Sequence, residues 1–168
     1  MSGFYKIVLD CRSMKKVLFV CLGNICRSPM AEAILKNKIE KLGLSSALEC
    51  DSCGTANYHI GDEPDYRTMK ILENNGIKFK HLGRQFSKTD FETFDFIFAM
   101  DKENLRNVQK LAPNETLKQK AMLFREYDPV DGGREVPDPY YGTIKNFEEV
   151  YQMLDRTCDC FIKKHFSE

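Results

Sequence analysis

The sequence lacks the charge bias that marks many nucleic-acid-binding proteins. Its 168 residues include 25 Lys and Arg and 25 Asp and Glu, so the formal net charge is zero. A chain with balanced charge offers no broad positive field to a phosphate backbone. We therefore expect no nucleic-acid partner.

Long apolar runs and a disulfide framework are also missing. A helix that crosses a bilayer needs about 20 apolar residues, and no run approaches that length. Residues 1–13 do not show the charged start and long apolar stretch of a secretion signal. The seven cysteines are odd in number, and their spacings indicate no set of bridges. These absences predict a cytoplasmic protein with free thiols and no membrane span.

Repeats and low-complexity tracts are absent as well, and the length suits one domain with a substantial core. We divide the chain at its second methionine, Met14. Residues 1–13 are interpreted as an N-terminal leader or a vector-derived extension, within which Phe4–Leu9 could form a strand. Residues 14–168 are interpreted as a single domain.

Short apolar runs alternate with helical patterns along that domain. Strands are predicted at 15–21, 48–52, 94–100 and 121–124, and helices at 28–42, 65–75, 101–111 and 147–165. Ser28 is expected to cap the first helix, with Pro29 at its first position. The alternation predicts an α/β fold with an open, mainly parallel four-stranded sheet and helices on both faces. The Pro- and Gly-rich segment 127–141 is expected to be an irregular loop over the carboxyl ends of the strands, where ligands bind.

The stretch Val17–Pro29 carries the pattern that indicates chemistry. It reads VLFVCLGNICRSP, which is a short apolar strand, a Gly-Asn turn and the start of a helix. This arrangement directs backbone N–H groups at an anion. Cys21 and Arg27 lie in it with the spacing Cys-x5-Arg. That spacing is common by chance, but its position in such a loop favours a cysteine nucleophile that attacks phosphate.

The residue types of this loop suit that chemistry. A free thiol has a pKa of about 8.5, so a nucleophile needs its thiolate stabilised. Loop N–H groups and the Arg27 guanidinium do this, and the planar guanidinium can also hold two phosphate oxygens. Gly23 lets the backbone approach the phosphate, and Asn24 tolerates a left-handed turn. Ser28 can donate its hydroxyl to the Cys21 sulfur.

These residues resemble a known family. The motif VCLGNICRSP at 20–29, with DPYYG at 138–142, is similar to the low-molecular-weight protein tyrosine phosphatases, a family of acid phosphatases. The resemblance extends from Lys15 to the C-terminus. It also includes Asp51-Ser52, Asn57–Gly61, Gly76, His81, Arg84-Gln85, Phe94-Asp95 and Ala99–Asp101.

The resemblance implies a reaction and a set of catalytic residues. Cys21 matches the nucleophile that forms a phosphocysteine, Arg27 the phosphate-binding arginine, and Asp138 the general acid and base. Without the resemblance, Asp138 would be an ordinary turn aspartate between two prolines. The implied substrates are phosphotyrosine proteins and small aryl phosphates, with inhibition by phosphate or oxyanion analogues. No metal or cofactor is expected.

The resemblance also implies supporting residues and a substrate pocket. The expected phosphate-binding loop and its supports are Leu22, Gly23, Asn24, Ile25, Cys26, Ser28, His81 and Asp101. Asp101 is expected to orient Arg27, to cap the following helix, or to do both. Leu22, Tyr58 and Tyr140 are expected to form an apolar wall against the substrate ring. Ordinary packing of these side chains is an equally good explanation from the sequence alone.

Regulation is a further implication. A reversible Cys21–Cys26 disulfide would protect the nucleophile from deeper oxidation. Tyr140 and Tyr141 resemble sites that tyrosine kinases phosphorylate. The cysteine pairs Cys50/Cys53 and Cys158/Cys160 could suggest zinc, but packing cysteines are the better interpretation of their spacing.

Two other functions stay open at this point. A thioredoxin-coupled arsenate reductase uses a related loop and fold, but it needs a relay of cysteines. A non-catalytic phosphotyrosine-binding module would not need the acid Asp138. The expected assembly is a monomer or a weakly self-associating protein.

Overall fold

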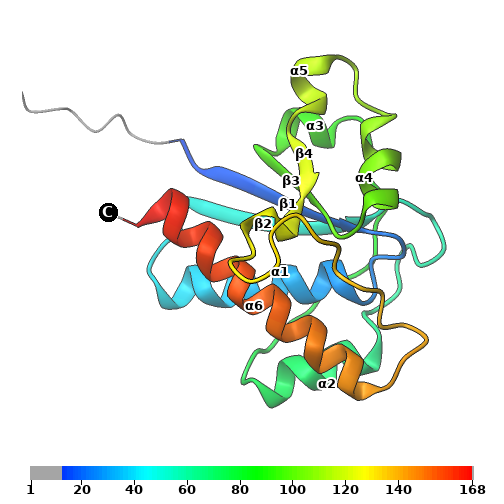
Figure 1. Ribbon diagram of the computed structural model, residues 1–168, viewed down its shortest axis with the longest axis vertical. Coiled ribbons are helices and arrows are strands. Elements are labelled where there is room, and N and C mark those ends of the chain that lie inside the picture. Colours follow the sequence, from blue (N-terminus) through cyan, green and yellow to red (C-terminus); the bar gives the residue numbers. More distant parts are fainter. Residues whose placement is uncertain (1–12, 168) are drawn as a thin grey trace, which may run out of the picture.

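The computed structural model describes residues 13–167, so the expectations for the leader and its strand at Phe4–Leu9 lie outside the described residues. The chain folds into four strands with helices between them (Figure 1). The strands are β1 (Lys15–Cys21), β2 (Leu48–Gly54), β3 (Phe96–Ala99) and β4 (Ala121–Leu123). The helices are α1 (Arg27–Lys41), α2 (Tyr66–Asn74), α3 (Asp90–Thr93), α4 (Lys102–Gln109), α5 (Glu115–Lys118) and α6 (Ile144–Phe166), with a 3-10 turn η1 (Phe124–Tyr127).

The four strands form one sheet in the order β2-β1-β3-β4, and every pairing is parallel. The predicted open α/β sheet is therefore confirmed. β1 lies inside the sheet, where Cys21 pairs with Gly54 of β2 and Val20 with Ala99 of β3. All carboxyl ends consequently meet at one edge, and the loop after β1 lies at the middle of that edge.

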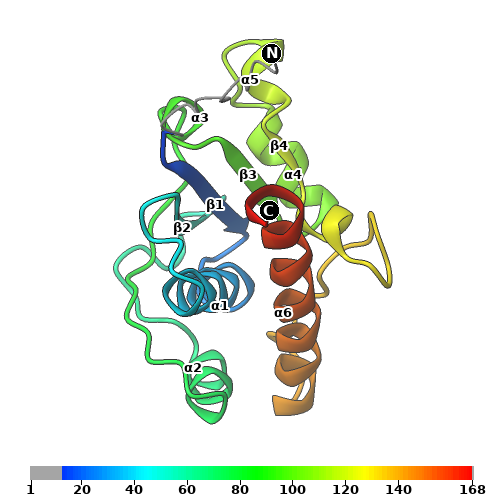
Figure 2. The same cartoon turned by 90° about the vertical axis from the view of Figure 1, so that its left-hand side faces the viewer.

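Helices cover both faces of the sheet (Figures 1 and 2). Alternate residues of β1 point to opposite faces. Val17 and Phe19 enter the larger core, which lies under α1, α2 and α6, and Leu18 and Val20 enter the smaller core, on the side of α3 and α4. Two apolar layers therefore hold β1 and fix the position of the loop that follows it.

The start of α1 differs from the expectation. Ser28 is not the cap, because the helix begins at Arg27 after Cys26, and no side chain caps its end. The Ser28 hydroxyl instead contacts the Cys21 sulfur and the Asn24 amide. Pro29 lies at the third helical position rather than the first, which costs no intrahelical hydrogen bond, since the first N–H groups of a helix have no partner.

The other differences concern the ends of elements. β3 begins at Phe96 rather than Phe94, because Phe94 is the C-cap of α3, which ends at Thr93. α6 begins at Ile144 rather than at 147. The short turns α3, α5 and η1 were not predicted. Residues 128–143 contain no helix or strand, as expected for the loop over the site. No helix within residues 13–167 is both long and apolar enough to cross a membrane.

Candidate active site

The loop between β1 and α1 is closed by the end of β2. The N–H of Thr55 donates to the Cys21 carbonyl at 2.9 Å. Gly54 lies so close to the loop that a Cβ there would be 2.7 Å from the Leu22 carbonyl oxygen. Only glycine therefore fits at this point of contact.

The Cys21 sulfur lies at the floor of this loop and has two hydrogen-bonding neighbours. Its Sγ is 3.0 Å from the Ser28 Oγ, and it accepts from the backbone N–H of Asn24 at 3.3 Å. The residue is 3 % exposed. Both groups can stabilise a thiolate, which is the arrangement that a sulfur nucleophile needs.

Asn24 holds the loop together. It has the left-handed backbone angle φ 57°, as its residue type allowed us to expect. Its side-chain amide donates to the Ser28 and Ser52 hydroxyls at 2.9 and 3.0 Å. Its amide oxygen accepts from His81 Nε2 at 2.7 Å and from the N–H of Arg84 at 3.1 Å. One buried side chain thus ties together the loop, β2 and the segment after α2.

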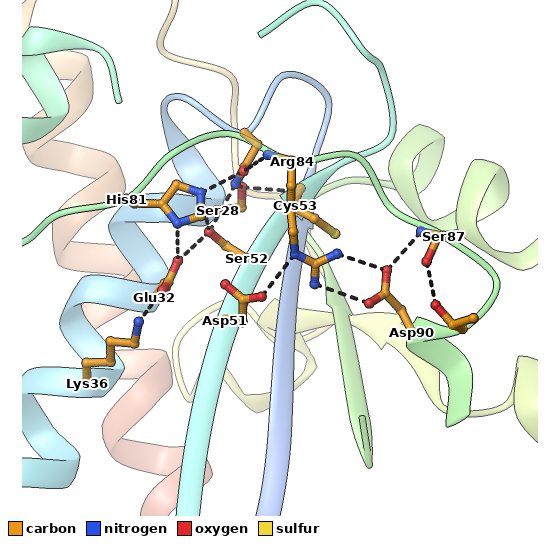
Figure 3. Close-up of polar contacts among 12 residues, drawn as sticks. Ser28, Glu32, Lys36, Asp51, Ser52, Cys53, His81, Arg84, Ser87 and Asp90 are labelled. Atoms are coloured by element: carbon orange, nitrogen blue, oxygen red, sulfur yellow. Dashed lines mark hydrogen bonds and ion pairs between the residues drawn. The ribbon is translucent and has the colours of Figure 1, made fainter. Parts of the chain in front are cut away.

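His81 is in turn held by Glu32, a residue that the sequence analysis missed (Figure 3). The Glu32 carboxylate lies 3.1 Å from His81 Nδ1 and also accepts from Ser52 and Lys36. Burial alone would raise the pKa of Glu32, but these three hydrogen bonds outweigh it and lower the pKa. Glu32 follows Ser28 by four residues on α1, so helical spacing was the signal that could have identified it.

Glu32, His81 and Asp51 also bring three potential metal ligands within 4.8 Å of one another. Both ring nitrogens of His81 face acceptors, Asn24 Oδ1 and the Glu32 carboxylate. A metal could bind this ring only by displacing one of these two contacts. We therefore explain this group as support for the loop.

Arg27 points from the start of α1 toward the loop over the site. Its guanidinium lies 2.7 Å from Asp101 Oδ2, 3.0 Å from the Val136 carbonyl oxygen and 3.7 Å from Asp138 Oδ2. Burial disfavours its charge, but Cys21, Asp101 and Asp138 outweigh burial and raise the pKa of Arg27. Asp101 also accepts from the Asn104 N–H at 2.7 Å, so both contacts expected of it are present.

Above the loop lies a pocket of about 330 Å³ that contains the expected catalytic and aromatic side chains. Asp138 is 45 % exposed at the mouth, and its Oδ1 accepts from the Tyr140 N–H at 3.0 Å. Leu22, Tyr58 and Tyr140 contribute the apolar wall, and His59, which was not expected, lies against Gly23. The lining residues are Cys21, Leu22, Gly23, Ile25, Cys26, Arg27, Tyr58, His59, Asp138, Tyr140 and Tyr141.

The second loop cysteine, Cys26, lines the same pocket and is buried. Burial, together with the nearby negative charge of Asp65, raises the pKa of its thiol. Burial also raises the pKa of Cys50, Cys53 and Cys158. These thiols are therefore neutral at pH 7, unlike a nucleophile that works as a thiolate.

The fold and this loop define a class of α/β protein in which a thiol and a guanidinium share one anion-binding site. Residues 16–167 match the model of the family described as low molecular weight phosphotyrosine protein phosphatase. The chain belongs to this family.

Relatives and solved structures agree. A low molecular weight phosphotyrosine protein phosphatase of Schizosaccharomyces pombe is 49 % identical over 149 residues, which is 88 % of this chain and 95 % of the relative. The crystal structure of a protein tyrosine phosphatase from Entamoeba histolytica has a TM-score of 0.85 and 41 % identity, covering 89 % of this chain and 96 % of that one. A Drosophila arginine phosphatase has a TM-score of 0.82 and 38 % identity, covering 91 % and 99 %.

Proposed function

We propose that this protein hydrolyses phosphotyrosine in proteins, and small aryl phosphates, through a phosphocysteine intermediate. The family model that it matches is described as low molecular weight phosphotyrosine protein phosphatase, and a 49 % identical relative carries the same name. The observation that carries the proposal is the convergence of three groups on one pocket. Cys21 lies at its floor, Arg27 beside it and Asp138 at its mouth.

In the first step, the Cys21 thiolate attacks phosphorus and the bond to the aryl oxygen breaks. Asp138, in its protonated form, gives its proton to the departing oxygen. Arg27 holds two phosphate oxygens as charge shifts, because Asp101 and the Val136 carbonyl fix its guanidinium. The products of this step are a phenol and a phosphocysteine.

In the second step, water attacks the phosphocysteine and the sulfur–phosphorus bond breaks. The Asp138 carboxylate accepts the proton of the water and is then ready for the next cycle. The departing thiolate is stabilised by the Ser28 hydroxyl and the Asn24 N–H, which lie 3.0 and 3.3 Å from the sulfur. Inorganic phosphate is released, so phosphate and oxyanion analogues are expected to compete with substrate.

The lining of the pocket supports an aromatic substrate. Leu22, Tyr58 and Tyr140 offer flat apolar surface to a ring, and a phosphoserine is too short to bring its phosphorus to a deep sulfur. Among the described lining residues, Asp138 alone carries a carboxylate. The guanidinium part of a phosphoarginine therefore finds no second acid, so we expect aryl phosphate to be preferred over it.

The two competing functions are less well supported. An arsenate reductase needs further cysteines that react in turn, but Cys50, Cys53 and Cys158 are buried, and burial raises their pKa. A binding module has no use for a carboxyl placed at the mouth of the pocket. Arsenate-dependent thiol oxidation faster than aryl phosphate hydrolysis would favour the first alternative, and binding without turnover the second.

The test is hydrolysis of an aryl phosphate by the wild type, Cys21→Ser and Asp138→Asn, each with and without a chelator. Cys21→Ser is expected to abolish turnover, because no phosphocysteine can form. Asp138→Asn is expected to slow it by about 10²- to 10⁴-fold, the usual contribution of a general acid. Cys160→Ser, which changes a half-buried cysteine on α6, is the control and should match the wild type. Full activity in Cys21→Ser, or loss of activity with the chelator, would contradict the mechanism.

We also propose that Cys26 protects Cys21 from irreversible oxidation. Peroxide converts the Cys21 thiolate to a sulfenic acid. The Cys26 sulfur then attacks the Cys21 sulfur, the proton of the Cys26 thiol passes to the departing hydroxide, and a disulfide and water form. Both cysteines belong to one loop and line one pocket, which supports this pairing.

The test compares recovery after oxidation. After a pulse of peroxide followed by a dithiol, the wild type should regain most of its activity, and Cys26→Ser should regain several-fold less because its sulfenic acid is oxidised further. Cys160→Ser is again the control. Equal recovery of the wild type and Cys26→Ser would exclude the protective disulfide.

The remaining expectations also stay proposals. Six free cysteines in the described residues and a thiolate mechanism support a cytoplasmic location. The 95 % exposure of Tyr141 supports its phosphorylation, as does the 41 % exposure of Tyr140, and mass spectrometry after treatment with a tyrosine kinase would detect either modification. A monomer or weak self-association is expected and can be measured by sedimentation.

A further inference from the structure

A buried cluster of charged side chains lies outside the pocket and takes no part in the two reaction steps. Arg125 of η1 and Asp128 have side chains that are 4 % and 0 % exposed. Arg125 Nε donates to Asp128 Oδ2 at 2.8 Å, and Arg156 of α6 holds the same carboxylate with two hydrogen bonds of 2.9 Å. Burying a charge is costly unless it is paired, so an arrangement of this kind calls for an explanation.

The guanidinium of Arg125 is enclosed by the segment that leads to Asp138. Its Nη1 donates to the Glu135 carbonyl oxygen at 2.8 Å, and its Nη2 to Asp131 at 3.2 Å. The N–H of Gly133 donates back to the Arg125 carbonyl at 3.0 Å. Three separate donors of one planar group are used, which a lysine could not reproduce.

The contact at Glu135 lies next to the catalytic groups. The following residue, Val136, is 1 % exposed, and its N–H donates to the Met100 carbonyl after β3 at 2.7 Å. Its own carbonyl accepts from Arg27 at 3.0 Å. Asp138 comes two residues later. The path of the backbone after Glu135 therefore sets the position of the Asp138 carboxyl group.

We propose that Arg125 is a positioning residue, which acts through segment 135–138 to place Asp138 for protonation of the leaving group. Asp128 and Arg156 fix the plane of its guanidinium. This inference rests on the proposed function, because it assigns Asp138 the role of the acid. Arg125 itself touches neither the pocket nor the substrate.

The experiment measures kcat/KM for a series of aryl phosphates, from dinitrophenyl phosphate to phenyl phosphate. A dinitrophenolate leaves without a proton, whereas a phenolate needs one. A misplaced acid therefore lowers kcat/KM most for phenyl phosphate. Arg125→Met is expected to lose on the order of 10- to 100-fold with phenyl phosphate, the cost of a misplaced catalytic group, and much less with dinitrophenyl phosphate. Arg134→Met, on the same segment but 74 % exposed, should match the wild type throughout.

Two further variants keep the test decisive. Arg125→Lys retains the buried charge, so it can be measured even if Arg125→Met does not fold. Its kcat/KM should show a dependence on the leaving group in the same direction as that of Arg125→Met, but smaller. In the Asp138→Asn background, Arg125→Lys should add no further dependence on the leaving group. An equal loss with every substrate, or the same loss with and without Asp138, would overturn the positioning role. A different result would contradict the proposed function itself: kcat/KM of Asp138→Asn that does not depend on the leaving group.

Discussion

At the scale of single residues, the phosphate-binding loop depends on polar side chains that are buried and fully paired. Asn24 uses both ends of its amide and also takes the left-handed backbone angle of the turn. Behind it, His81 and Glu32 form a second layer, with the Glu32 side chain 1 % exposed. A buried network of this kind is rigid only when every member has a partner. Each of these side chains therefore fixes the geometry of the loop and contributes to the free energy of unfolding.

The first prediction concerns Glu32. Its folded-state pKa is lowered, so its contribution to stability is complete above the unfolded-state pKa of about 4.5 and is lost as pH falls through the lower folded-state pKa. Glu32→Gln, which loses the ion pair with Lys36 and the carboxylate that faces His81, should cost about 3 kcal/mol of unfolding free energy at pH 7. Urea unfolding at pH 7, 5, 4 and 3 measures this.

The control for that experiment is Glu40→Gln, which changes an exposed glutamate on the same helix. It should follow the wild type at every pH. The difference between the wild type and Glu32→Gln should shrink as pH falls below about 4.5, where the unfolded chain starts to take up the proton. A difference that stays constant down to pH 3 would show that the charge of Glu32 is not what stabilises the fold.

At the scale of elements, the loop over the site is attached at two points. Its first half is held from within by Arg125, and its second half by Arg67 of α2. Arg67 donates to the Gly142 carbonyl at 3.2 Å, and its guanidinium lies 5.7 Å from the centre of the Tyr140 ring. It is also paired at 2.9 Å with Asp65, whose N–H donates to the Ile25 carbonyl. One arginine thus connects the phosphate loop to the aromatic wall.

The second prediction follows from this connection. Arg67→Met should raise KM for aryl phosphates about fivefold with little change in kcat, because Tyr140 loses a cation–π contact of about 1 kcal/mol while Cys21 and Arg27 stay in place. Steady-state kinetics measures both constants. Lys70→Met, at an exposed position of the same helix, is the control. A fall in kcat with unchanged KM would place the effect on the chemical step instead.

At the scale of the whole molecule, a large aromatic part of the core lies at the end of the sheet opposite to the pocket. Phe161 of α6 is fully buried, and its ring centre lies 5.2 Å from that of Phe96, 5.3 Å from Phe98 and 5.2 Å from Tyr127. Phe96 begins β3, whereas Asp101 follows its end. This aromatic group therefore lies toward the end of the strands that is away from the pocket.

The third prediction uses that separation. Phe161→Ala should lower the unfolding free energy by about 3–5 kcal/mol, the usual cost of removing a buried phenylalanine. The activity of the folded fraction should not change. Urea unfolding and active-site titration measure the two quantities, and Phe166→Ala, at a half-buried position of the same helix, should cost less. A fall in kcat of the folded fraction would show that the two ends of the sheet are coupled.

The sequence was sufficient for the order of the strands and the longer helices, the parallel sheet and the loop after β1, because each rests on local patterns. Apolar runs of strand length, a Gly-Asn turn and a following helical pattern are all contiguous in the chain. The family also followed from short motifs at 20–29 and 138–142, and residues 16–167 match its model.

Only the tertiary structure decided which distant side chains meet. Three contacts join residues of different segments, which no local pattern encodes: Glu32 with His81, the Val136 carbonyl with Arg27, and Arg156 with Asp128. The tertiary structure also decided between the two predictions for Ser28, because the hydroxyl does not cap the helix but does lie against the Cys21 sulfur. A hydroxyl takes whichever partner packing brings within about 3 Å, and that choice is made by the whole fold.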